Sequence, residues 1–195
     1  MIRAKLFATP FYATALFAMA AFPGQAAAQQ ADAVTTSEVG GVTLYSNWNI
    51  VQNVTKSPVH KTLIKAISAA GLVDELSASG PFTLFAPTDK AFAAIPKMTG
   101  WLMTPANSAT LAEVLKFHVV PGRLSASDLY KKIKAGGGTA VLTTIAGEDL
   151  KLTEVQGNIR IEGTQGSVGF ITGNDVEQAN GMIHVINGVL MPTLG

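Results

Sequence analysis

The chain has 195 residues, of which 48% are apolar and 14% are charged, and its formal net charge is +1. That apolar share is ample for one sizeable hydrophobic core. The charge balance excludes a phosphate-tracking nucleic-acid binder, which carries a strong basic excess, and an acidic disordered chain. The sequence has no cysteine, which excludes disulfide scaffolds, thiol catalysis and cysteine-ligated metal centres.

The first 28 residues have the pattern of a secretory signal peptide. Arg3 and Lys5 form a basic start, an apolar stretch runs from Leu6 to Phe22, and Ala26-Ala27-Ala28 offers a small-residue cleavage site. An uncleaved transmembrane anchor is the alternative, but the apolar stretch is at the short end of what spans a bilayer. We therefore predict that residues 1–28 are removed and that the mature chain is exported, to the periplasm or outside the cell, without a transmembrane anchor.

The mature chain is expected to hold one folded domain. Residues 29–45 are polar and rich in small side chains, which predicts a disordered leader. Orderly patterns begin near Ser46 and continue to about residue 193, and no internal repeat divides them. The sequence therefore predicts a single domain over residues 46–193.

The first half of this domain has the spacing of helices. Four segments begin with a Ser or Thr that fits a helix start and continue with apolar residues three or four positions apart. These segments are expected as helices at 57–70, 88–94, 110–118 and 125–134. A compact apolar run bounded by prolines, Phe82–Ala86, predicts one short buried strand.

The second half alternates apolar and polar residues between short glycine-containing connections. It predicts the strands of a meandering sheet, at 139–145, 150–155, 159–162, 168–172 and 182–190. A helical half that feeds such a sheet is an α+β pattern.

The sequence offers little for catalysis or for binding a metal or cofactor. Its three histidines, His60, His118 and His184, are far apart, and no metal-ligand pair or Gly-x-Ser-x-Gly elbow occurs. A Ser-His-Asp arrangement can still assemble in space from distant residues. We expect a protein without catalytic residues, metal or cofactor. Asn53-Val54-Thr55 is a formal glycosylation sequon.

Two polar residues have both a structural and a binding interpretation, and a third has a structural one. His118 fits a core histidine at a helix end, or a rim residue for a partner beside Phe117. Asp89 fits a first-turn carboxylate that bonds backbone amides, which is a structural role. Asp175 follows Gly173-Asn174 and fits either a turn or a recognition carboxylate.

Three segments closely resemble the signature segments of the fasciclin domain family. They stand in family order with family spacing, and the resemblance extends over about residues 49–192. The segments are Gly80–Phe92, Leu115–Leu124 and Asn180–Pro192. The resemblance implies a twisted β-wedge of antiparallel strands flanked by several helices.

The resemblance also implies a role, because family members are secreted or surface proteins of cell adhesion and matrix contact. In animal relatives, an Asp-Ile pair and a Tyr-His pair are integrin-recognition motifs. The matching positions here are Asp175-Val176 and Phe117-His118, where Val replaces Ile and Phe replaces Tyr. The implied function is a non-catalytic module that binds a cell-surface or matrix protein through Asp175, Val176, Phe117 and His118.

A further branch of the family binds carotenoids in an apolar groove, which implies an alternative function as the carrier of an apolar small molecule. The segment Pro96–Pro105 is typical of a loop or broken helix with excess apolar content. Its Trp101, Met98 and Met103 are expected as apolar anchors for a partner or such a ligand, and Trp48 is a further candidate. For Trp101 the structural alternative is packing over the core.

The signal-peptide prediction has a direct test. The intact mass of protein purified from its native source should correspond to a chain that begins at Gln29. A mass that includes Met1–Ala28 would contradict cleavage.

Overall fold

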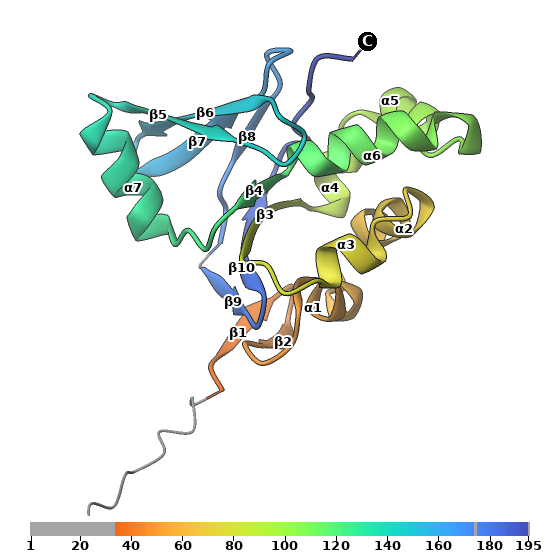
Figure 1. The fold of residues 1–195 in the computed structure, drawn as a ribbon, viewed down its shortest axis with the longest axis horizontal. Coiled ribbons are helices and arrows are strands. Elements are labelled where there is room, and N and C mark those ends of the chain that lie inside the picture. Colours follow the sequence, from red (N-terminus) through yellow and green to blue (C-terminus); the bar gives the residue numbers. More distant parts are fainter. Residues whose placement is uncertain (1–33, 174, 195) are drawn as a thin grey trace, which may run out of the picture. The chain divides into compact units, whose positions relative to one another are not determined.

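The computed structural model describes residues 34–173 and 175–194 (Figure 1). The expected signal peptide, residues 1–28, lies outside the described residues. No helix within those ranges is long and apolar enough to cross a bilayer. The described strands are β1 (Thr36–Val39), β2 (Val42–Tyr45), β3 (Phe82–Pro87), β4 (Val119–Pro121), β5 (Thr139–Thr143), β6 (Asp149–Val155), β7 (Asn158–Glu162), β8 (Val168–Phe170), β9 (Val176–Gln178) and β10 (Gly181–Ile186).

The helices lie mostly in the first half of the domain, as the spacing of its apolar residues predicts. They are α1 (Ile50–Lys56), α2 (Lys61–Ala69), α3 (Val73–Ser77), α4 (Asp89–Ala93), α5 (Pro96–Leu102), the 3₁₀ turn η1 (Pro105–Asn107), α6 (Ser108–Phe117) and α7 (Ala126–Ala135). Figure 1 shows α1 to α6 on one side of the central strands, and α7 with β5 to β8 on the other.

The central sheet has the strand order β4-β3-β10-β9. β10 pairs with β3 in parallel, so that Leu84 lies opposite Ile183, while β4 and β9 pair antiparallel at the two edges. All six residues of β10 are buried, as expected of a strand covered on both faces. Gly181 is needed here because a Cβ at this position would collide with the carbonyl oxygen of Phe82.

The central sheet lies between two hydrophobic cores. Along β3, Leu84 and Ala86 belong to the core under the helices, while Phe85 belongs to the core shared with α7 and β5 to β8. This alternation follows from the two-residue period of a strand. The second sheet, in the order β5-β6-β7-β8, is the antiparallel meander that the sequence predicts.

The prediction that the last strand continues this meander was wrong. Residues 181–186 pair with β3 in the central sheet instead of with a strand of the second sheet. An isolated β-bridge between Ile171 and Ile186 connects this strand to the chain that follows β8. Alternating hydrophobicity identifies a strand but not its partner, and a strand buried on both faces prefers a central, parallel position.

The leader prediction was also wrong from Thr36 onward. Residues 36–45 form the β1–β2 hairpin, whose register places Val39 opposite Val42 across Gly40-Gly41. Both glycines have positive φ, which a two-residue hairpin turn requires, and the buried side chains of Val39 and Leu44 anchor the hairpin to the core.

Some helix boundaries differ from the expected ones. Ser57 ends α1 instead of starting a helix, because the proline that follows it favours the extended backbone that Ser57 adopts. Pro96 opens α5 instead of ending a helix, as proline at a first helical position can. Thr110 lies inside α6, which already begins at Ser108 after the η1 turn. Thr88 and Ser125 cap α4 and α7 as predicted.

Candidate functional site

Three of the four residues at the two family motif positions lie inside the fold. Phe117 ends α6 and His118 caps it, and both side chains are fully buried. Val176 begins β9 and is buried as well. These three side chains therefore offer no surface to a partner, and the structural interpretation of His118 is the one that its burial supports.

His118 is a neutral, fully bonded core histidine. Its Nδ1 lies 2.7 Å from the carbonyl oxygen of Val114, to which it donates, and its Nε2 accepts the N–H of Leu190 at 2.9 Å. Burial lowers the pKa of His118 to about 4, although the bond to Val114 opposes this. The ring thus ties the end of α6 to the chain that follows β10.

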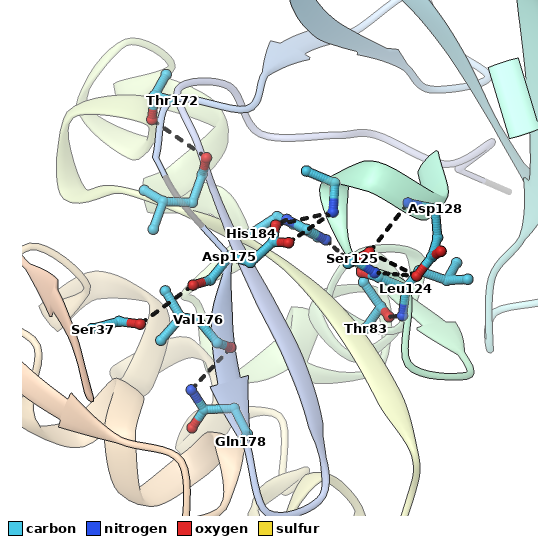
Figure 2. Close-up of polar contacts among 12 residues, drawn as sticks. Ser37, Thr83, Leu124, Ser125, Asp128, Thr172, Asp175, Val176, Gln178 and His184 are labelled. Carbon is cyan, nitrogen blue, oxygen red and sulfur yellow. Dashed lines mark hydrogen bonds and ion pairs between the residues drawn. The ribbon is translucent and has the colours of Figure 1, made fainter. Parts of the chain in front are cut away.

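Asp175 caps helix α7 from a distant part of the chain (Figure 2). Both of its carboxylate oxygens accept the N–H of Ala126, each at 3.0 Å, and its side chain is 31% exposed. Ser125 completes the cap through a reciprocal pair of bonds with Asp128. A carboxylate at this position satisfies a free helix N–H and favours the helix dipole.

His184 lies beside Asp175 in an arrangement that lacks a nucleophile (Figure 2). Its Nε2 donates to the carbonyl oxygen of Leu124 at 2.8 Å, and its Nδ1 lies 3.4 Å from Asp175 Oδ1. In a hydrolase triad the first nitrogen would face a serine hydroxyl. Here a backbone carbonyl takes that place, and the buried Nδ1 has no hydrogen-bond partner among the described residues, because the neutral ring uses its N–H on Leu124. Burial lowers the pKa of His184, against the effects of Leu124 and Asp175.

Hydrogen bonds of Thr83 and Arg123 hold the loop that precedes α7. Thr83 Oγ1 donates to the carbonyl oxygen of Gly122 and accepts the N–H of Leu124. The Arg123 guanidinium donates to backbone carbonyl oxygens of Gln178 and Gly181, each at 2.8 Å. Sequence reasoning missed Arg123, because a cation that bonds backbone carbonyls leaves no periodic or motif signal.

The pair formed by Ser57 and His60 is buried. The Nε2 of His60 has no hydrogen-bond partner among the described residues. Asp89 accepts the N–H of Thr62 at 2.6 Å and that of Lys61 at 3.3 Å. These bonds hold the pKa of Asp89 below its ordinary value although burial acts in the opposite direction. Asp89 therefore bonds backbone amides as predicted, but the amides belong to α2 and not to its own helix, α4.

The sequon asparagine is also an internal residue. Asn53 is fully buried, its Oδ1 accepts the N–H of Tyr45 at 3.1 Å, and its Nδ2 donates to the Tyr45 carbonyl oxygen and to the side chain of Gln178. The folded domain therefore does not present Asn53 for glycosylation.

The predicted apolar anchors differ in exposure. Met98 and Trp101 lie one turn apart on α5 and are 37% and 46% exposed, whereas Met103 is partly buried against the helical core. Trp48 lies elsewhere, with its ring centroid 5.2 Å from that of Tyr45. Trp48 lines a cavity of about 330 Å³ along α1, together with Val51, Gln52, Thr55 and Lys56.

Comparisons with known proteins agree with this architecture. The family model of the fasciclin domain matches residues 58–192. The chain belongs to the fasciclin domain family. Protein sll1483 of Synechocystis is 36% identical over 150 residues, which is 76% of each chain. Transforming growth factor-beta-induced protein ig-h3 of Sus scrofa is 31% identical over 136 residues, 67% of this chain and 17% of that protein.

A solved structure shares the fold of this fasciclin domain. It is the FAS1 domain pair of the insect cell adhesion molecule Fasciclin I, with a TM-score of 0.67 and 21% identity, over 83% of this chain and 64% of that one. The predicted α+β class is confirmed, with the qualification that the central strand pair is parallel.

The burial of His118 predicts acid sensitivity of this fasciclin domain. The pKa is about 4 in the folded state and near 6.5 in the unfolded chain, so the unfolded state binds the proton first as pH falls. The stability that neutral His118 contributes is therefore full above pH ~6.5, and between that pH and ~4 on the order of 2–3 kcal/mol is lost. Urea unfolding of wild type and His118→Gln should give free energies that differ at pH 7 and converge near pH 4.5. A difference that stays constant with pH would contradict the neutral buried ring.

The contacts of Asp175 predict a measurable structural role. Asp175→Ala should lower the free energy of unfolding by about 1–2 kcal/mol, because the Ala126 N–H loses its acceptor. Glu177→Ala is the matched control, since Glu177 is exposed and accepts one bond from the exposed Thr35, and it should change stability by less than ~0.5 kcal/mol. Equal, small effects of both substitutions in urea unfolding would show that the cap is dispensable.

Proposed function

We propose that this fasciclin domain is a non-catalytic, exported module that binds a partner at a cell surface or in an extracellular matrix. One structural observation supports the proposal above the others. Met98 and Trp101 are two large apolar side chains one turn apart on α5, and both are exposed to solvent. Tryptophan in such a position is a frequent centre of binding energy at protein surfaces.

The proposal assigns binding to α5 instead of the two family motif positions. Phe117, His118 and Val176 are buried, and both carboxylate oxygens of Asp175 accept the N–H of Ala126. A partner would reach Phe117, His118 and Val176 only after the domain opens, whereas Met98 and Trp101 are accessible without any rearrangement. The similarity to a domain pair from an insect cell adhesion molecule supports an adhesive role as an analogy of fold.

The non-catalytic part of the proposal is supported by the two His-containing arrangements. The Ser57-His60 pair is buried, and the Asp175-His184 pair faces the carbonyl oxygen of Leu124. The exported location is supported by the basic and apolar start of the sequence and its small-residue cleavage site.

A second function, carriage of an apolar small molecule such as a carotenoid, is favoured by the cavity beside Trp48. This cavity is an open surface groove of about 330 Å³, in which Trp48 and Val51 supply apolar lining beside the polar Gln52, Thr55 and Lys56. An absorbance spectrum of natively purified protein distinguishes the two functions. A carrier should be coloured or lipid-loaded when isolated, and Trp48→Ala should release the ligand. An adhesion module should be colourless.

The adhesive function is tested by attachment of the fluorescently labelled domain to intact cells of the source organism. The double variant Met98→Ser/Trp101→Ser should bind at least about tenfold more weakly, because it removes the central apolar contact. Val141→Ser is the matched control: Val141 is 60% exposed on β5, in the second sheet. Attachment that is equal for both variants and wild type would place the binding surface elsewhere.

A further inference from the structure

Charge is distributed unevenly along this fasciclin domain. From Val42 to Ala112 the chain has five lysines, Lys56, Lys61, Lys65, Lys90 and Lys97, and three acidic residues, Asp74, Glu75 and Asp89. Glu75 is paired with Lys116 at 3.0 Å, and Asp89 accepts the N–H groups at the start of α2. Among the described residues, none of the five lysines lies within 4 Å of a carboxylate.

Four of these lysines lie on α5 or on helices that pack in series up to it, and α5 carries the exposed apolar pair. α2, which carries Lys61 and Lys65, packs against α4, which carries Lys90. α4 in turn packs against α5, which carries Lys97. α5 lies at the end of the helical layer that is remote from α7 (Figure 1). We use the term α5 face for Lys90, Lys97, Met98 and Trp101, all of which are exposed.

The polar side chains around the α5 face are turned onto their own backbone. Thr99 Oγ1 donates to the carbonyl oxygen of Phe92, and Thr104 Oγ1 donates to that of Gly100. Asn107 Nδ2 donates to the carbonyl oxygen of Trp101 at 2.8 Å. No acidic residue occurs from Lys90 to Ala112. The surface thus combines apolar side chains and cations while its hydroxyl and amide donors are already used.

We propose that the α5 face docks on the surface of an anionic lipid bilayer, an inference that rests on the proposed function because it names the partner of the same surface. Tryptophan favours the interface between lipid and water, and Met98 beside it can enter the acyl boundary. Lys90 and Lys97 attract anionic headgroups, and no carboxylate within the segment repels them. A glycan or a polar peptide would instead require hydrogen-bond acceptors as well as donors, and the side chains of the α5 face offer lysine donors but no oxygen acceptor.

A face with two apolar anchors and a few lysines binds weakly and reversibly. Each lysine near an anionic surface contributes roughly a fivefold gain in partitioning, and added salt screens that gain. Binding should therefore increase with the anionic lipid content and decrease with ionic strength.

The proposal is tested by co-sedimentation of the mature domain with vesicles. Vesicles of phosphatidylcholine mixed with phosphatidylglycerol should bind it at low salt, and vesicles of phosphatidylcholine alone should bind it much less. Lys90→Gln/Lys97→Gln should reduce partitioning by more than tenfold, at roughly fivefold per lysine. The control Lys132→Gln/Lys134→Gln makes the same change of net charge on α7 and should leave most of the binding intact.

Tryptophan fluorescence reports whether α5 itself enters the interface. In a Trp48→Phe background Trp101 is the remaining tryptophan of the mature chain, and its emission should shift to the blue on anionic vesicles. Absence of vesicle binding would overturn the proposal, as would equal losses in the α5 and α7 variants.

Failure of the lipid proposal can be separated from failure of the proposed function. If vesicles are not bound but Met98 and Trp101 are needed for attachment to cells, and protease treatment of those cells abolishes it, the partner is a protein and the lipid proposal is overturned. If neither vesicles nor cells depend on these two residues, both proposals fail. Attachment to protease-treated cells together with vesicle binding supports the lipid surface.

Discussion

The parallel pairing of β3 with β10 is the constraint on which the rest of this fasciclin domain depends. It joins Phe82–Pro87 to Gly181–Ile186, segments far apart in the chain, into the centre of one sheet. A parallel pair is stable when both of its faces are covered. The helices α1 to α6 cover one face through Leu84 and Ile183, and the second sheet with α7 covers the other through Phe85. Both layers are therefore required by one strand pair.

The buried polar residues secure the chain where it enters and leaves that pair. Asn180, just before β10, accepts the N–H of Ile50 and donates to the carbonyl oxygens of Leu76 and Ala78. His118 bonds Leu190 after β10, and Asp175 fastens the chain before β9 to α7. Removal of Asn180 or His118 would leave a buried backbone group without its partner, and removal of Asp175 would leave the partly buried N–H of Ala126 without its acceptor. Residues in the motif segments therefore have a structural reason for their identity that is independent of any partner.

The sequence predicts elements that are defined locally and fails where the information lies in distant contacts. The strand at 82–86 and the Ser125 cap are set by neighbouring residues and were confirmed. Helix α1 was missed although Asn49 and Gln52 form its capping box, and β9 is too short to show a period. The cap that Asp175 gives to Ala126 joins residues 49 positions apart, so no spacing rule indicates it. The exposure of Met98 and Trp101 likewise depends on how α5 is rotated against the core.

Because of that rotation, neighbouring residues of α5 differ in burial within a single turn of the helix. Leu102 is buried in the helical core and fixes α5, while Trp101, its neighbour, points to solvent. Successive helical residues lie about 100° apart around the axis, so one position can be fixed by packing while the next is free to meet a partner. Substitutions at Met98 and Trp101 thus leave the strand pair and its polar ties untouched, whereas substitutions at His118 or Asn180 do not.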